Sequence, residues 1–417
     1  MTARSVARRV RRWSRSVKVL AVLGPGLIAA NAGNDAGGIA TYASAGAQYA
    51  YRTLFVMVLV TIALIIVQEM SARLGVYTGE GLVSLIREQF ALRWAALAVV
   101  ALLIANLGLV VSEFAGIGAG FELLGVSRYI SVPLAAVVIW AVVSVGSYRY
   151  AERVFLILTL PFLAYPIAAV LGHPHWGTVA GNTVVPHLIG NRPFLLLCVA
   201  LIGTTITPYM QLYQAAAVAD RGTQASDYRS ARSDAIVGSI FCNLISMSII
   251  IAVAAAIGGQ GPLTSAAQAA KALEPVVGSS AKSLFAIGLL GASALAAAVV
   301  PLSTAYALSE AVGVERSISS SFREAPLFNG LFTGQIVIGV AVALAPGNLI
   351  SLLINTQIIN GLVAPIFLTF LLVLASRPAV LGAAVNTPRF RVAATTCVVV
   401  VGVLAAVAAV TTVASWL

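Results

Sequence analysis

The sequence has very few charged residues: aspartate, glutamate, lysine and arginine make up 9% of its 417 residues, whereas 60% are hydrophobic. A soluble domain carries about 25% charged residues, so this chain has too little polar material to cover a water-soluble globule. Apolar runs of about 20 residues recur along the chain, and each is long enough to cross a bilayer as a helix. Alternating segments of about ten residues, which a membrane β-barrel would need, are absent. The sequence therefore predicts an all-α polytopic membrane protein.

Cysteine and histidine are equally scarce, with three residues of each. Cys198, Cys242 and Cys397 lie inside apolar runs at unrelated spacings, which argues against a disulfide framework or a cysteine metal cluster. His173 and His175 lie in a connecting segment, where they form either a metal-holding pair or part of an ordinary polar loop. The sequence also lacks a nucleophile–base pair, a phosphate-binding loop and a soluble nucleotide-binding domain. From these absences the sequence predicts that the protein is not an enzyme and that it holds no cofactor.

Acidic residues are fewer than basic ones: 14 against 25, which gives a net charge of +11. With a cytoplasmic N-terminus and eleven spans, 20 of the 25 basic residues fall in cytoplasmic segments, as the positive-inside rule requires. The charge therefore indicates topology, not nucleic-acid binding. We expect a monomeric multi-pass protein of the cell membrane, with the lipid bilayer around it and an extracellular C-terminus. The predicted spans are 19–45, 53–74, 94–120, 129–147, 152–171, 194–219, 235–257, 283–312, 328–345, 348–375 and 392–416.

Two of these spans are interrupted by polar stretches. Asn31–Gly38 in the first span contains three glycines and Asp35, an ionisable residue that is costly in hydrocarbon. Gly203–Gln211 in the sixth span contains three threonines and Pro208, which removes a backbone donor. Unwound backbone survives in a membrane only where it lines a cavity or is buried in protein. Two broken helices that lie five spans apart predict an inverted-repeat transporter with a binding site between them.

The breaks also predict how the chain is organised. Spans one to five and six to ten form the two repeats, and span eleven is an addition. The segments are a basic cytoplasmic N-terminal segment (1–18), a first five-helix repeat (19–171), an extracellular loop (172–193), a second five-helix repeat (194–375) and the additional helix (392–417).

The residues at the two breaks offer mainly oxygen donors. Asp35 supplies a carboxylate, and the unwound backbone and the threonines supply carbonyls and hydroxyls, a hard set that suits Mg²⁺, Ca²⁺ or Mn²⁺. One carboxylate cannot neutralise a dehydrated divalent ion, which favours an ion that keeps part of its water shell, as Mg²⁺ does. Gln357 and Asn360 share one face of the tenth span, where they serve either helix–helix hydrogen bonds or the site. Glu113 lies deep in the third span, whereas Glu69 lies close to the end of the second.

Motifs along most of the chain resemble one known family. Gly24–Gly26 followed by Asn34–Thr41 is similar to that family's Asp-Pro-Gly-Asn signature, and Gly203–Tyr209 occupies the place of its Met-Pro-His motif. Ser71–Gly75 and Thr356–Gln357 resemble further segments of it. The family is that of the natural resistance-associated macrophage proteins (NRAMP), which are divalent metal transporters. The resemblance implies a LeuT-type inverted repeat, with metal bound between the unwound parts of spans one and six.

The resemblance also implies which residues form the site, and where this chain departs from the family. Thr207 stands where the family has a methionine ligand, Gly38 where it has an asparagine ligand, and Tyr209 where it has a histidine on the proton route. These departures resemble an NRAMP-related magnesium transporter branch. The implied metal site consists of Asp35, Gln357, Thr207, Gly38 and the carbonyls of Ala32 and Thr204, with Tyr209, Asn360 and Glu113 lining the cavity.

The first functional hypothesis is a secondary transporter that imports partly hydrated Mg²⁺, and also Mn²⁺, by alternating access without proton coupling. The alternative is a proton-coupled Mn²⁺/Fe²⁺ symporter that uses Glu113. A sodium-coupled carrier of amino acids on the same fold is a third hypothesis, which the carboxylate of Asp35 disfavours because it would repel the substrate carboxylate. A fourth is a scaffold that has lost transport, which the retained Asp35 disfavours.

Overall fold

The computed structural model describes residues 34–145, 164–261, 263, 269–270, 278–312, 314, 323–345 and 349–413. All regular secondary structure in these residues is helical. Eight helical stretches among them are long and apolar enough to cross a membrane, and Arg128–Ser144 is a shorter apolar helix. Wherever the chain is described, helices occupy the predicted spans. The N-terminal segment 1–18, the first part of span one with Ala32, and the start of span five lie outside the described residues.

The helices occupy both predicted repeats. Those of the first repeat are α3 (Ala36–Tyr49), η1 (Ala50–Thr53), α4 (Leu54–Thr78), α5 (Leu82–Gln89), α6 (Leu92–Leu123), α7 (Arg128–Val145) and α9 (Ala164–Leu171). Those of the second repeat are α11 (Arg192–Thr205), α12 (Pro208–Asp220), η3 (Ala225–Asp227), α13 (Tyr228–Ile257), η4 (Gly278–Ser280), α16 (Ala281–Val312), α17 (Pro326–Ala343) and α18 (Leu349–Ala375). They are followed by α19 (Pro378–Leu381), η5 (Gly382–Ala384) and α20 (Pro388–Val413).

Local sequence signals explain several helix ends. Gly79 ends α4 in the left-handed conformation (φ 67°), which glycine adopts without a steric penalty. The side chain of Asn191 caps α11 by accepting the backbone N–H of Phe194 at 2.9 Å. Pro208 and Pro326 stand at the first positions of α12 and α17, where the missing N–H costs no helical hydrogen bond.

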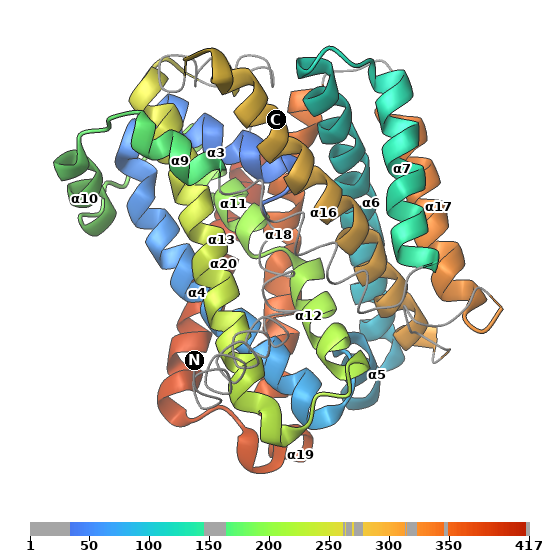
Figure 1. The fold of residues 1–417 in the computed structure, drawn as a ribbon. Helices are drawn as coiled ribbons and strands as arrows, with labels where there is room; N and C mark the ends of the chain where they lie inside the picture. Colours follow the sequence, from blue (N-terminus) through green and yellow to red (C-terminus); the bar gives the residue numbers. More distant parts are fainter. Residues whose placement is uncertain are drawn as a thin grey trace, which may run out of the picture.

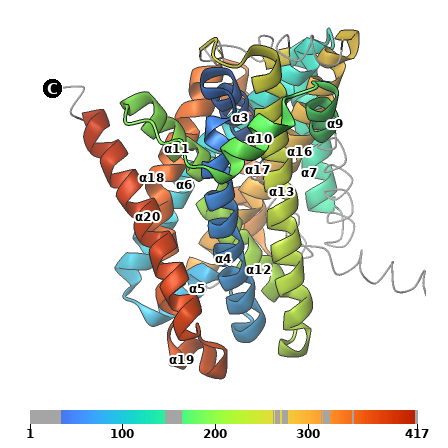
Figure 2. The same ribbon diagram turned by 90° about the vertical axis from the view of Figure 1, so that its left-hand side faces the viewer.

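The segment 172–193, which the sequence predicts as an extracellular loop, contains the nine-residue helix α10 (Trp176–Val184). Figure 2 shows α10 at one end of the bundle and α19 at the other. We refer to these as the α10 end and the α19 end. By the predicted orientation of the chain, the α19 end faces the cytoplasm.

Small residues let the helices at the centre of the bundle approach closely. A side chain at Gly75 in α4 would collide with the backbone carbonyl of Ala215 in α12, and one at Gly203 in α11 would collide with the backbone of Gln357 in α18. Close backbone approach of this kind is the usual mode of helix packing in membranes. Figure 1 shows α11 and α12 as two separate pieces in the middle of the bundle. The interrupted span therefore lies in the protein interior.

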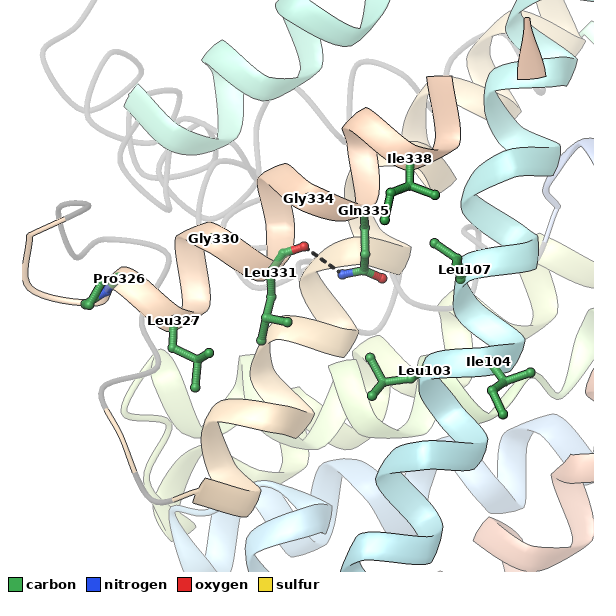
Figure 3. Close-up of a pocket in the computed structure, with 10 residues that line it drawn as sticks. All are labelled: Leu103, Ile104, Leu107, Pro326, Leu327, Gly330, Leu331, Gly334, Gln335 and Ile338. Atoms are coloured by element: carbon green, nitrogen blue, oxygen red, sulfur yellow. Dashed lines mark hydrogen bonds between the residues drawn. The ribbon is translucent and has the colours of Figure 1, made fainter. Parts of the chain in front are cut away.

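An apolar groove of about 460 Å³ lies between α6 and α17 (Figure 3). Its lining holds no charged side chain. Gln335 is its one amide, and the Nε2 of this residue donates to the carbonyls of Leu331 and Pro301, each at 3.2 Å. Ile104 on the groove wall is 67% exposed. Because the groove opens beside an apolar outer surface and offers no charge, it is not suited to an ion.

Candidate metal-binding site

The break predicted in span six is present and has a specific geometry. α11 ends at Thr205 and α12 begins at Pro208, so Ile206 and Thr207 interrupt the span. Thr207 is extended (φ −72°, ψ 140°). Pro208 has no N–H to offer to the carbonyl of Thr204, four residues earlier. The sequence itself therefore removes the regular helical hydrogen bond from residue 208 to the carbonyl of Thr204, which the resemblance implies as a ligand.

Asp35 begins the helical second half of span one. Its side chain caps α3 by accepting the backbone N–H of Gly38. The Nε2 of Gln357 donates to both carboxylate oxygens, at 3.0 and 2.9 Å, and the hydroxyl of Thr204 donates at 3.5 Å. Asp35 thus brings together α3, α11 and α18. In the described part of span one, regular helix starts at Ala36, within the predicted polar stretch.

The partners of Asp35 are all neutral. Asp35 is fully buried, and no basic side chain of the described chain forms an ion pair with it. A buried carboxylate is costly unless it is paired or coordinates a metal. The neutral donors hold the carboxylate in place but leave its charge without a counter-charge. The arrangement therefore suits a cation that arrives from solution.

Gln357 is held close to Asp35 by two features. Gly37 lies against its amide, and any side chain at that position would collide with Nε2. Asn360, one turn further along α18, donates from Nδ2 to the Oε1 of Gln357 at 3.4 Å. Gln357 and Asn360 therefore do share one face, and that face is turned to the Asp35 region. The Oδ1 of Asn360 is buried without a hydrogen-bond partner among the described residues.

Glu113 reaches the same region from α6. Its Oε2 accepts the backbone N–H of Ala36 at 3.1 Å, and its Oε1 accepts the hydroxyl of Ser112 at 3.1 Å. Glu113 is fully buried. Two carboxylates therefore accept backbone N–H groups from the first turn of α3: Asp35 accepts that of Gly38, and Glu113 accepts that of Ala36. The predicted place of Glu113 beside the site agrees with this geometry.

Thr207 and Tyr209 lie at the break, but no hydrogen bond joins either of them to Asp35. The hydroxyl of Thr207 donates to the Sδ of Met210 at 2.7 Å, and the side chain of Thr207 also hydrogen-bonds to Tyr209. Gly38 contributes its N–H to the carboxylate of Asp35. Ala32 lies outside the described residues. Of the implied set, Gly38, Thr204 and Gln357 contact Asp35 directly, whereas Thr207 lies at the break of span six without a hydrogen bond to it.

Some residues of this region have partners that the sequence does not indicate. Asn34 donates from Nδ2 to the carbonyl of Cys242 at 3.1 Å and accepts the hydroxyl of Ser246 at 2.6 Å, which ties the start of α3 to α13. The hydroxyls of Tyr42 and Thr205 lie 3.0 Å apart, between α3 and α11. The polar stretch around Asp35 marks Asn34 as a candidate, but its partners in α13 are more than 200 residues away.

The site is closed in this structure. Asp35, Thr204, Thr207, Gln357 and Asn360 are all fully buried. No group of three or more histidine, cysteine, aspartate or glutamate side chains that could hold a metal occurs among the described residues. The site is thus no preformed cage of charged ligands. An ion would be held by one carboxylate together with neutral oxygens.

Comparisons with known proteins agree with the geometry. The family model described as "Natural resistance-associated macrophage protein-like" matches residues 26–411. The divalent metal cation transporter MntH of Ralstonia nicotianae is 33% identical over 294 residues, which cover 66% of this chain and 65% of that protein. A crystal structure of the Eremococcus coleocola manganese transporter matches with a TM-score of 0.75 at 19% identity, covering 94% of this chain and 86% of that one.

A third match extends the fold beyond metal transporters. The structure of MhsT in complex with L-phenylalanine matches with a TM-score of 0.61 at 14% identity, covering 92% of this chain and 97% of that one. Likeness at this identity shows the fold alone, and it confirms the expected LeuT-type architecture. The family match, by contrast, spans nearly the whole chain. The chain therefore belongs to the natural resistance-associated macrophage protein-like family of divalent metal transporters, and it is a transporter and not an enzyme.

Proposed function

We propose that this protein carries divalent metal ions across the membrane by alternating access and that Mn²⁺ is one of its substrates. The observation that carries the proposal is the buried carboxylate of Asp35, held by neutral donors at the start of α3, beside the interrupted span of α11 and α12 and beside α18. The relatives whose names state a substrate, a divalent metal cation transporter and a manganese transporter, support the same class of cargo.

Mg²⁺ is a second candidate substrate, and one specific observation favours it. The side chains nearest to the carboxylate of Asp35, those of Gln357 and Thr204, offer only hard oxygen and nitrogen atoms. Gly38 adds no side-chain ligand, so the protein would supply fewer ligands and water would complete the shell of the ion. A site of this kind suits an ion that dehydrates reluctantly.

Proton coupling is a separate property of the same site. Absence of coupling is the hypothesis favoured by Tyr209, which stands in place of the family's histidine. Moving two charges through 100 mV releases about 4.6 kcal/mol, enough to drive accumulation without a proton. Glu113 favours the rival hypothesis, because it is a buried carboxylate bonded to the residue next to Asp35. The two hypotheses differ in whether metal uptake acidifies the interior.

Uptake into proteoliposomes tests these proposals. Purified protein is reconstituted with an inward-negative potential, and the uptake of Mn²⁺ and of Mg²⁺ is recorded beside an internal pH dye. We expect Mn²⁺ uptake that the substitution Asp35→Asn abolishes. The matched control is Glu122→Gln, a carboxylate at the end of α6 whose side chain is 48% exposed and pairs with Arg128.

Each outcome has a definite meaning. Uptake of neither ion by the unsubstituted protein refutes the proposed function. Mg²⁺ uptake without acidification supports the uncoupled magnesium hypothesis. Mn²⁺ uptake with acidification that is lost in Glu113→Gln supports the proton-coupled alternative.

A further inference from the structure

The groove between α6 and α17 is a wedge with one closed end. Gly339 of α17 sets the closed end, because a side chain at this position would collide with Val110 of α6 and crowd Phe114. From this contact the two helices diverge, and the lining of the groove extends along α17 as far as Pro326 (Figure 3). The groove is therefore narrow where the helices touch and open where α17 begins.

The walls of the groove face the bilayer and leave it unfilled. Ile104, Leu327 and Ile338 are exposed apolar residues of its lining. Gly330 and Gly334 line it too, and a side chain at either position would meet nothing within 4 Å. The volume of about 460 Å³ is that of a small-ligand site. A membrane-spanning helix, about 30 Å long and 10 Å wide, would need several times more. The groove therefore fits a narrow apolar chain.

The open end of the groove lies at the α19 end of the bundle. Arg377, which precedes α19, donates to the carbonyl of Gln89 at 3.1 Å and so places the start of α6 there. Arg87 of α5 donates to the carbonyl of Ala311 at 3.0 Å, which places the end of α16, the helix before α17, at the same end. Trp94, in the first turn of α6, is exposed, as tryptophans at a membrane interface are. A chain that enters the groove therefore comes from the leaflet at the α19 end.

Basic side chains stand at this open end on both helices. Arg323 is exposed and lies three residues before the start of α17. Arg93 is exposed and precedes Ile104 by three helical turns, so both lie on the face of α6 that borders the groove. Glu324 follows Arg323 and is already engaged within the protein. Basic side chains beside a gap between membrane helices suit the phosphate of a lipid headgroup.

We propose that the groove binds one acyl chain of an anionic phospholipid and that Arg93 and Arg323 hold its phosphate. The chain lies along Gly330 with its end toward Gly339, and the headgroup stays at the surface of the leaflet at the α19 end. The lipid thereby joins α17 to α6, the helix that carries Glu113. This inference goes beyond the proposed function, because it does not depend on which ion is carried.

Native mass spectrometry of the full-length protein tests the proposal. The protein is delipidated in detergent and titrated with phosphatidylglycerol or, separately, with phosphatidylcholine of the same chain length. Gly330→Leu fills the groove, and the double variant Arg93→Gln/Arg323→Gln removes both arginines. The matched controls are Ala406→Leu, at an exposed position of α20 outside the groove, and Arg52→Gln, an exposed arginine of η1.

We expect one phosphatidylglycerol to bind more tightly than phosphatidylcholine. Gly330→Leu should weaken its binding by about tenfold or more, because the acyl chain loses its place, and the double arginine variant should weaken it by about tenfold. Both control variants should bind like the unsubstituted protein. Unchanged binding in Gly330→Leu overturns the proposal, as does equal binding of the two lipids. A dimer that is lost in Gly330→Leu also overturns it, because the groove would then be a contact between two copies of the chain.

Discussion

Two buried carboxylates of this protein have opposite surroundings. Asp35 at the centre of the bundle is held by neutral donors from Gln357, Thr204 and the backbone of Gly38. Glu69 near the α19 end forms an ion pair with Arg73 at 3.2 Å, in which the two side chains are 5% and 8% exposed. A carboxylate that is already paired with an arginine side chain does not need a metal ion to balance its charge. The comparison suggests that Asp35 serves an incoming ion, whereas Glu69 serves the fold.

The surroundings of Arg73 agree with a structural role. Arg73 donates to the carbonyl of Ala384 at 3.0 Å and to the side chain of Asn386, and its guanidinium lies 5.2 Å from the centre of the Phe390 ring. The hydroxyl of Tyr228 donates to Glu69. The pair therefore joins α4 to the start of α13 and to the segment that leads into α20. We refer to Glu69, Arg73, Tyr228 and Asn386 as the α19-end cluster.

The largest expected effect separates the two carboxylates by function. Asp35→Asn should lower metal uptake by about 100-fold or more, because it removes the negative charge of the carboxylate that attracts the ion. The free energy of unfolding should stay the same or rise, since the substitution removes a buried charge that has no counter-charge. Uptake in proteoliposomes and denaturant unfolding in detergent measure both. A large loss of stability in Asp35→Asn would contradict the comparison.

The second prediction concerns Arg73. Arg73→Met should destabilise the protein by about 3 to 5 kcal/mol, because it leaves the carboxylate of Glu69 buried without its partner. The double variant Glu69→Gln/Arg73→Met should recover part of this loss, because no unpaired charge then remains. The free energy of unfolding in detergent is the measurement. If Arg73→Met is as stable as the unsubstituted protein, the ion pair does not hold the α19-end cluster together.

The sequence predicts the site better than it predicts the α19-end cluster, and the reason is physical. The break at Pro208 and the polar stretch around Asp35 are local signals, because they interrupt the apolar run in which they lie. Gln357 is polar at the same depth of span ten, and the structure places its amide on Asp35. A polar residue inside a membrane span points to a functional site even when its partner in the fold is not known.

The α19-end cluster gives no comparable signal. Glu69 lies close to a span end, where the sequence allows an interfacial position, but the structure buries it at 4% exposure. Its partner Tyr228 is 159 residues away, and Arg73 meets Asn386 across 313 residues. Pairings of this kind depend on how the helices pack, which periodicity along the chain does not encode. Helix α10 lies in a segment that the sequence predicts as a loop, and the sequence does not indicate it either.

A third prediction sharpens the description of the site. Gly37→Ala should reduce metal uptake by about tenfold to 100-fold, because the new methyl group displaces the amide of Gln357 from Asp35. The shorter side chain in Gly37→Ala/Gln357→Asn should restore part of the uptake. Gly334→Ala is the matched control, since a side chain there meets nothing within 4 Å. Equal uptake by Gly37→Ala and Gly334→Ala would show that the position of Gln357 does not matter for transport.

The smallest expected effects come from a matched pair of asparagines, one in each region. Asn386→Ala should lower the free energy of unfolding by about 1 to 3 kcal/mol, because it leaves a donor of the Arg73 guanidinium unpaired and removes the 3.0 Å bond to Ser376. Asn360→Ala should change stability by less than about 1 kcal/mol, because its one bond to Gln357 is long at 3.4 Å and its Oδ1 has no partner among the described residues. Its effect should instead appear as a several-fold weaker affinity for Mn²⁺, whereas Asn386→Ala keeps the affinity of the unsubstituted protein. Because both substitutions remove the same buried amide, a reversed pattern would mean that the α19-end cluster takes part in binding the ion and that the division between the two carboxylates is wrong.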